Sequence, residues 1–427
     1  MGFDKNIIYC NKTGFFSLLI TLFLISFPRS WSLYPLVFFL VCGLFLWVFN
    51  FKNLKTSFLN KLNYLLPLII YFFIHLISLL LQKGNILLIE KILIFMFVPL
   101  LGFPVFNSEF FKINIIYLKI SFIAGITIIL FYLIFNAIYS VYRVIPDDYT
   151  FIEFLSLMKE RFFGSYISVL EHPTYLSMKI LWCLLIFLII PSELKIKRNL
   201  IIFFFLLFSV FLFFLASKAA IILWAILTVI LMVKWPTKKI GKIIVIMFFV
   251  PIFTLFVGIS INNITRIKGF ISDKKSALNK EKIDWKNFDL RTREWFSAIQ
   301  IIREKPLSGC GLVKVEDRMV EEYLKNGWKE EAKLRYNAHN QFLETQMTFG
   351  IPGTLSLLWM LFNPLIFRKR LKYPLLATAF VIMISYFLLF ESMLVRQWGI
   401  MFFTLFYCIL MFSEKDEKDN QTGLKFY

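Results

Sequence analysis

The chain contains only three histidines in 427 residues, so the position of each one is informative. His172 and His339 each lie just before a long apolar run, whereas His75 lies in the middle of one. Imidazole titrates near neutral pH and often accepts the proton of an attacking hydroxyl. We interpret His75 as a histidine that bonds to a neighbouring helix, and we take His172 and His339 as candidates for chemistry.

Cationic side chains occur beside other apolar runs. Lys218 interrupts an apolar stretch, where a charge beside lipid is costly unless it faces water or an anion, or snorkels to the interface. Arg291 shares a predicted helix face with Trp295, whereas Arg293 is expected to be a solvated surface residue. Arginine forks onto phosphate oxygens and lysine acts as a point charge, so these side chains suit an anion such as a lipid-linked pyrophosphate.

Glu391 and Arg396 form a further charged pair between the last two apolar runs. Because they lie five positions apart, they are expected to contact other loops rather than each other, and a purely structural role is an equal alternative. Together, the candidate cations and an uncharged imidazole could hold a departing pyrophosphate and accept the proton of an attacking hydroxyl.

The elements that must position these residues are apolar. The sequence is 59% hydrophobic and contains 53 phenylalanines, more than a soluble core absorbs. Most apolar runs approach the roughly 20 residues that a spanning helix needs. They occupy residues 14–27, 32–49, 62–81, 86–106, 113–142, 175–192, 199–216, 219–233, 243–260, 341–366, 373–390 and 398–412. The sequence therefore predicts an all-α integral membrane protein of about 12 transmembrane helices.

The distribution of positive charge predicts the orientation of these helices. With a cytoplasmic N-terminus, the short inner segments carry 17 Lys and Arg residues and the short outer loops carry four. This excess marks the cytoplasmic side. It places five candidates at one outer membrane surface: Lys218, Arg291, His339, Arg396 and His172. The first apolar run lacks a clear cleavage site and is interpreted as a retained helix rather than a signal peptide.

Composition also excludes other classes of protein. The net charge of +20 is spread over the ends of the apolar runs rather than gathered in one stripe, which argues against nucleic-acid binding. The five cysteines show no CxxC spacing, so neither a disulfide framework nor a zinc site is expected. No cofactor is predicted.

The predicted organisation has four parts. Residues 1–260 form transmembrane helices 1–9, with an outer loop at 143–174, and residues 339–413 form helices 10–12. Between the ninth and tenth helices, residues 261–338 form a large periplasmic loop, whose 17 basic and 12 acidic residues indicate a folded, helical cap. Residues 414–427 are expected to form a disordered cytoplasmic tail.

Four short motifs follow one another in the second half of the chain. Among them the sequence predicts an amphipathic helix, which stops at Pro306, and a turn at residues 308–311. The motifs are Arg291-x3-Trp295, Pro306-x2-Gly309-x-Gly311, His339-Asn340-x-Phe342-Leu343 and Gly350-x2-Gly353. In this order they resemble the hallmark of the O-antigen ligase and polymerase superfamily. The similarity covers about 65 residues closely, and the twelve-span layout extends it loosely to the whole chain.

The resemblance implies an inverting, metal-independent enzyme of a bacterial inner membrane that moves a glycan from undecaprenyl pyrophosphate to an acceptor on the periplasmic face. Arg291 matches the family arginine expected to contact the pyrophosphate, and His339 matches the essential histidine, so both are assigned to catalysis. Lys218 stands where the family usually has an arginine, which keeps the charge but loses the two-pronged phosphate contact. Arg396 is a further pyrophosphate-binding candidate. The substrate-binding candidates are His172, Tyr175, Asn340 and Glu391.

Alternatives within and outside the superfamily stay open. A ligase attaches finished glycan to lipid A-core and a polymerase adds it to another lipid-linked repeat, and the well-formed His339-Asn340 motif slightly favours ligation. A lipid-linked oligosaccharide flippase would need charges near mid-membrane in both halves of the chain. A scaffold with a folded outer loop leaves Lys218 and the motifs unexplained. The predicted partners are the lipid-linked donor, the acceptor and the bilayer.

Overall fold

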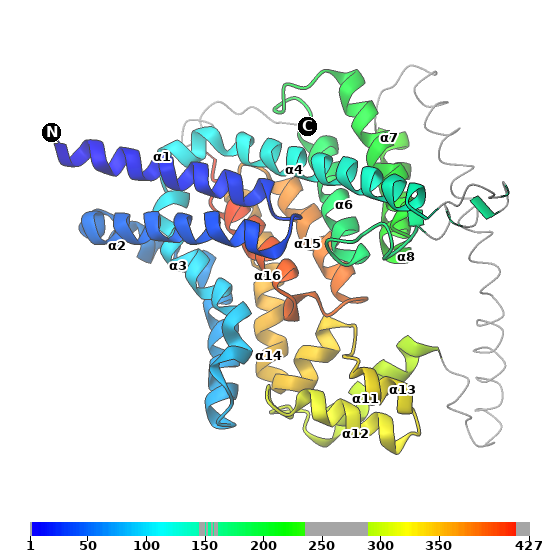
Figure 1. Ribbon diagram of the computed structural model, residues 1–427. Coiled ribbons are helices and arrows are strands. Elements are labelled where there is room, and N and C mark those ends of the chain that lie inside the picture. The colour runs from blue at the N-terminus through cyan, green and yellow to red at the C-terminus, as the bar shows by residue number, and fades with distance from the viewer. Residues whose placement is uncertain are drawn as a thin grey trace.

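The computed structural model describes residues 2–144, 161–234 and 289–415, together with Thr150, Glu153, Phe154 and Leu157. These residues form helices, and no β-strand occurs among them (Figure 1). Within the described residues, an isolated antiparallel β-bridge joins Leu371 and Glu414. The all-helical fold is therefore confirmed. The predicted ninth apolar run, at residues 243–260, lies outside the described part of the chain.

The helices form two groups. Those that overlap predicted apolar runs are α1 (Gly2–Phe23), α2 (Arg29–Leu81), η1 (Ile86–Leu93), α3 (Ile94–Phe106), α4 (Glu109–Tyr142), α6 (Pro173–Ile189), α7 (Arg198–Phe214), α8 (Lys218–Lys234), α14 (Gln341–Ile366), α15 (Pro374–Leu388) and α16 (Gln397–Met411). The cap, defined here as residues 289–338, contains α11 (Leu290–Glu304), α12 (Val315–Lys325) and α13 (Lys329–Leu334). Short 3-10 turns are η3 (Arg368–Arg370) and η4 (Met393–Val395).

Four segments of the described chain are long and apolar enough to cross a membrane. They are Ser30–Leu81, Ile86–Phe106, Glu109–Tyr142 and Gln341–Arg370. Five shorter apolar helices accompany them, including α6, α15 and α16. Membrane-helix character is thus supported, and the number of twelve spans stays a prediction.

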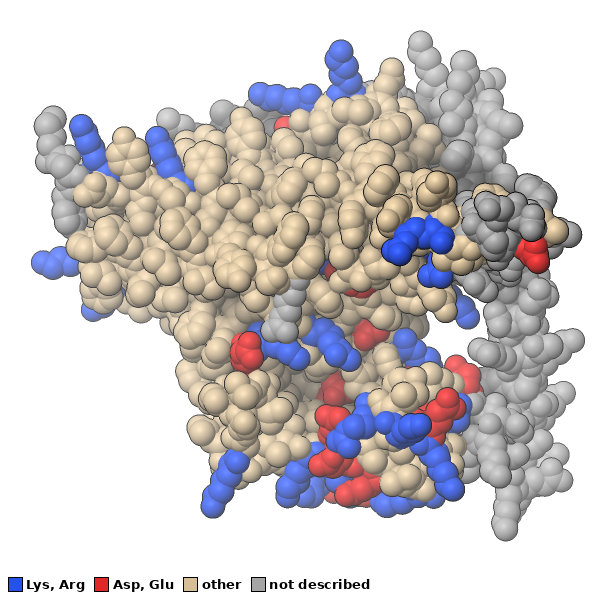
Figure 2. Space-filling view, in the orientation of Figure 1, with Lys and Arg blue, Asp and Glu red and all other residues tan. Residues whose placement is uncertain are grey.

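The cap lies at one end of the molecule, beneath α6, α8 and α16 and beside the lower part of α14 (Figure 1). Acidic and basic side chains gather over the cap, whereas the surface over α2 and α4 is largely uncharged (Figure 2). This division is typical of a lipid-embedded body that carries a water-exposed cap.

Aromatic rings fill the interior of the body. Trp182 of α6 packs edge-on against Phe380 of α15 and Phe406 of α16, with ring centroids 5.1 and 5.5 Å apart. Phe106, at the end of α3, stacks on Phe412 at 5.7 Å. Such ring pairs contribute about 0.5–1.5 kcal/mol each beyond the area that they bury. They join helices that are distant in sequence.

Two long helices break at single residues. The helix α2 combines two predicted apolar runs and departs from helical geometry at Asn50 (φ −129°, ψ 27°). The helix α14 departs from it at Gly350 (φ 65°, ψ −153°), a backbone conformation that is essentially restricted to glycine. A short helical segment that begins at Gln341 therefore precedes the longer part of α14.

The predicted turn after α11 docks on α14 through glycines. The N–H of Gly311 donates to the carbonyl oxygen of Thr348 at 2.8 Å. A Cβ atom on Gly309 would lie 2.4 Å from the same oxygen, and a Cβ atom on Gly350 would lie 2.2 Å from the carbonyl oxygen of Leu307. The motif glycines therefore allow two backbones to approach each other closely.

The opposite side of this turn is held by the end of α2. The Nε2 group of Gln82 donates to the carbonyl oxygen of Cys310 at 2.8 Å, and its Oε1 accepts the N–H of Val313 at 2.7 Å. The N–H of Leu312 donates to Oγ of Ser78 at 3.0 Å. The cap is thus fixed between α2 and α14.

The substitution Gly350→Ala is expected to lower the free energy of unfolding by about 1–3 kcal/mol through backbone strain, and further through the clash with Leu307. A matched control is Gly327→Ala, because Gly327 also has a positive φ (76°) but open space around it. Thermal unfolding of the purified protein in detergent measures both variants. Equal decreases in Tm would contradict the docking role of Gly350.

Candidate functional site

His339 lies at the junction between the cap and α14, where its left-handed backbone conformation (φ 43°) turns the chain. Its N–H donates to Oδ1 of Asn337 at 3.0 Å. The next residue, Asn340, caps α14 by accepting the N–H groups of Phe342 and Leu343. These bonds hold a conformation that is uncommon outside glycine. The imidazole is 25% exposed and can therefore be reached by a substrate.

A buried carboxylate faces this imidazole. Glu294 of α11 has a fully buried side chain, and its Oε1 lies 3.1 Å from Nδ1 of His339. Both carboxylate oxygens and Nδ1 of His339 lack a hydrogen bond of standard geometry among the described residues, so this contact is a close approach of the two groups rather than an aligned hydrogen bond. A buried carboxylate is unfavourable unless a proton donor or a cation meets it, so the contact favours a proton on Nδ1. The other ring nitrogen, Nε2, is then the proton acceptor.

Arg291 joins α11 to the same junction. Its Nη1 donates to the carbonyl oxygen of His339 at 3.2 Å and lies 3.9 Å from Oε2 of Glu294. The side chain is 42% exposed, and a guanidinium has five N–H donors, so the others can bind an anion. The predicted amphipathic helix is confirmed, and it ends at Glu304, before Pro306.

His172 caps α6 on a turn that is anchored in the body. Its Nδ1 accepts the N–H of Thr174 at 3.3 Å, and its ring lies edge-on to that of Tyr175, with centroids 6.1 Å apart. Directly beside it, Nζ of Lys179 lies 2.7 Å from Oε2 of Glu171, and both side chains are buried. Breaking such a pair would leave an uncompensated buried charge, so the ion pair fixes the turn.

His172 shares its surroundings with candidates from distant parts of the sequence. Partial burial lowers the pKa of His172 from its ordinary value, which favours the neutral ring. Three nearby groups lower the pKa further, namely His339, Arg291 and Arg396. Glu391 is also near enough to act, in the opposite direction. The fold thus brings these predicted residues to one place.

Lys218 and Asn340 differ from the other candidates. Lys218 is exposed at the start of α8 and forms no ion pair or hydrogen bond with another candidate in the described chain. The side-chain oxygen of Asn340 is engaged in capping α14. The roles of both residues in substrate binding stay predictions.

Arg293 is not the solvated surface residue that the sequence suggested. Its Nη1 lies 2.6 Å from Oε1 of Glu331, whose side chain is buried, and its guanidinium lies 6.0 Å from the ring centroid of Trp328. This pairing depends on the packing of α11 against the segment around α13, which the helical spacing of α11 alone does not reveal.

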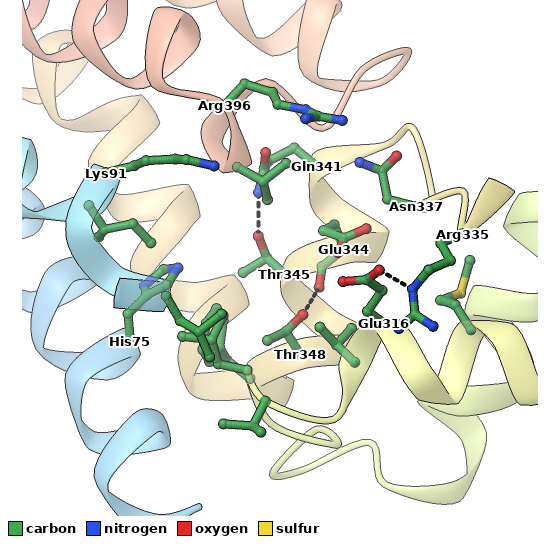
Figure 3. A pocket seen from close by; sticks show the side chains of 18 of the residues that line it. His75, Lys91, Glu316, Arg335, Asn337, Gln341, Glu344, Thr345, Thr348 and Arg396 are labelled. Atoms are coloured by element: carbon green, nitrogen blue, oxygen red, sulfur yellow. Dashed lines mark hydrogen bonds and ion pairs between the residues drawn. The ribbon is translucent and has the colours of Figure 1, made fainter. Parts of the chain in front are cut away.

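A pocket of about 410 Å³ lies next to the site, between α2, η1, the start of α14 and the cap (Figure 3). Asn337 and Gln341, which flank His339 in the sequence, line it. Arg396 lines it as well, and Lys91 extends into it from η1 (Figure 3). The pocket therefore adjoins the cluster of candidate residues.

Three residues near the site were either not predicted from the sequence or were interpreted differently. Glu294 lies three positions after Arg291, so both occupy one helix face, and that spacing is the signal that could have identified it. Lys91 is an ionisable residue inside an apolar run, which is itself a functional signal. His75 lines the pocket and packs on a neighbouring helix as expected, with its ring centroid 4.2 Å from that of Phe349 in α14, but its Nδ1 lies 2.8 Å from the carbonyl oxygen of Tyr71 in its own helix.

Comparison with known families finds a match that overlaps part of this site. A family model described as O-Antigen ligase matches residues 203–358, which include α8, the cap and part of α14. Lys218, Arg291 and His339 lie inside this range, and Arg396 lies outside it. No curated protein matches the chain.

Proposed function

The chain belongs to the O-antigen ligase superfamily, and from this premise we propose that it transfers a glycan from an undecaprenyl-pyrophosphate-linked donor to an acceptor hydroxyl. The proposed acceptor is lipid A-core at the periplasmic face of the bacterial inner membrane, and the transfer inverts the anomeric carbon without a metal. The observation that carries this proposal is the contact of the His339 imidazole with buried Glu294, together with the hydrogen bond from half-exposed Arg291 to the backbone carbonyl of His339.

The proposed reaction makes one bond as it breaks another. The acceptor oxygen bonds to the anomeric carbon while the bond from that carbon to the pyrophosphate breaks. The hydroxyl proton passes to Nε2 of His339, and the bonding electrons leave with undecaprenyl pyrophosphate. Arg291 and Arg396 stabilise the negative charge that develops on the leaving group. Lys218 adds a further positive charge at this membrane surface.

Glu294 acts as a positioning residue in this proposal. Its carboxylate holds Nδ1 of His339 in the protonated form and fixes the direction of the ring, so that Nε2 faces the acceptor. It also stabilises the imidazolium that forms when the hydroxyl proton is accepted. Its complete burial removes competition from water.

The substitution Glu294→Gln is expected to lower kcat about tenfold or more. This decrease is a part of the roughly 10²–10⁴-fold contribution of a general base, because Glu294 acts through His339. Glutamine fills a similar space, but its amide carries no charge and can donate to Nδ1, which selects the wrong tautomer. The donor KM is expected to stay within about twofold. Glu294→Asp keeps the carboxylate and is expected to recover part of kcat. If both variants only reduce the amount of folded protein, Glu294 is structural.

The cellular test compares lipopolysaccharide ladders and lipid-linked glycan in a strain that lacks this protein. Long lipid-linked chains that never reach lipid A-core are expected for a ligase. A single repeat on the lipid, and at most one on the core, would instead identify a polymerase. An unchanged profile would contradict glycan transfer and return attention to the flippase and scaffold alternatives.

A further inference from the structure

The pocket beside His339 is not needed for the proposed proton transfer. His339, Glu294 and Arg291 are not among the residues that line it. Its walls come from α2, η1, α12, the start of α14 and the segment before His339. A volume of about 410 Å³ falls within the roughly 300–1,000 Å³ that is usual for small-ligand pockets. One sugar unit would fit such a space.

Buried polar groups of α14 line one wall of this pocket. Gln341, Glu344 and Thr345 are each less than one-tenth exposed. Nε2 of Gln341 donates to Oγ1 of Thr345 at 3.1 Å, and Oε2 of Glu344 accepts the N–H of Ala338 at 3.1 Å. The second carboxylate oxygen of Glu344 makes no hydrogen bond with a described residue, so it can accept one from a ligand. Carboxylate, amide and hydroxyl groups are the partners that sugar hydroxyls need.

Two cations face the pocket and have no acidic partner among the described residues. Lys91 is half-buried in η1, and Arg396 precedes α16. Neither forms an ion pair with a carboxylate of the described chain. Figure 3 shows both side chains among those that line the pocket, with no interaction drawn between either cation and an acidic residue. A partly desolvated ammonium is unfavourable unless an anion or water meets it.

The third cation of the pocket provides a contrast. Arg335 pairs with Glu316, and its Nη2 lies 2.6 Å from Oδ1 of Asp317. Its charge is therefore already neutralised within the cap. The unpaired positive charge is confined to the side of the pocket formed by Lys91 and Arg396, which adjoins the proposed reacting cluster.

We propose that this pocket binds a sugar unit that carries a negatively charged substituent, a phosphate or a carboxylate, and that Lys91 contacts that substituent. The inference rests on the proposed glycan transfer and adds to it a charge preference for one sugar close to the reacting centre. The sugar belongs either to the donor glycan or to the acceptor, because both must meet beside His339. The oxygen of Gln341 already accepts the N–H of Leu394, so the second N–H of its amide and the free carboxylate oxygen of Glu344 hold the sugar hydroxyl groups.

The first test is direct binding, which needs no turnover. The probes are glucosamine 6-phosphate, galacturonic acid and neutral galactose, added to full-length protein in nanodiscs and followed by saturation-transfer NMR. Charged probes are expected to bind the wild type about tenfold or more tightly than galactose, since bonds to charged groups are stronger. Lys91→Gln is expected to abolish the difference and Lys91→Arg to keep it. No charge preference in the wild type would overturn the proposal.

The second test identifies the source of the sugar in reconstituted transfer with purified donor and acceptor. A rise in the acceptor KM of Lys91→Gln places the charged sugar on the acceptor, and a rise in the donor KM places it on the donor. A matched control is Lys83→Gln, because Lys83 is exposed and does not line the pocket. Unchanged KM values for both substrates would overturn the proposal. Absence of transfer by the wild type would instead contradict the proposed function. The binding experiment would then still test whether the pocket prefers a charged sugar.

Discussion

The substitution His339→Ala is expected to reduce glycan transfer by about 10²–10⁴-fold, the usual contribution of a general base. Alanine cannot accept the hydroxyl proton, and it leaves Glu294 buried without the proton donor that it faces. The donor and acceptor KM values are expected to change much less than kcat, because the cations and the pocket remain. Initial rates in proteoliposomes, corrected for the amount of folded protein, measure the effect.

Two variants control this experiment. Lys333→Ala changes an exposed residue of α13 and is expected to keep full activity. His339→Gln keeps a polar side chain of similar reach but cannot accept a proton at neutral pH, so it is expected to be as inactive as the alanine variant. Full transfer by folded, inserted His339→Ala protein would contradict the assigned role.

Replacing Arg291 by alanine is expected to reduce transfer by about 10²–10³-fold, the effect of removing one donor that stabilises developing negative charge. The donor KM is expected to rise as well, because a pyrophosphate carries its charge before the reaction begins. Arg291→Lys is expected to recover only part of the activity, since lysine restores the charge without the forked geometry. Donor titrations at fixed acceptor concentration measure both quantities.

Arg303→Ala serves as the matched control for Arg291. Arg303 is an exposed arginine on the same helix, so its removal changes the net charge of α11 equally without touching the junction with His339. It is expected to leave the donor KM unchanged. If both arginine variants raised the donor KM equally, the effect would come from the overall charge of the cap and not from a specific contact.

Apolar runs predicted the helices well because length and hydropathy are local properties of the sequence. They did not predict that two runs would form one helix with a kink at Asn50, or that Gly350 would divide α14. The glycine motif was visible in the sequence, but its role was not. That role is the close approach of Gly309 and Gly350 to opposing backbones, which depends on packing between distant segments.

Part of the candidate site could also be predicted. Charge placement and orientation predicted five residues at one surface, Lys218 among them. The fold brings Arg291, His339, Arg396 and His172 near one another, whereas Lys218 forms no ion pair or hydrogen bond with another candidate in the described chain. Glu294 was missed because carboxylates on amphipathic helices usually face solvent, and only tertiary packing buries this one against His339. Lys91 was a local signal, but the pocket around it could not be predicted because its walls come from segments far apart in sequence.

The most direct measurement of the central claim uses purified protein in proteoliposomes with an undecaprenyl-pyrophosphate-linked glycan and a lipid A-core acceptor. The glycosylated acceptor and the released undecaprenyl pyrophosphate are quantified together, and the anomeric configuration of the new bond is determined by NMR. We expect the two products in equal amounts, an inverted anomeric carbon, and loss of both products in His339→Ala. No transfer from this donor to any hydroxyl acceptor, or transfer that is unaffected by the loss of His339, would contradict the account.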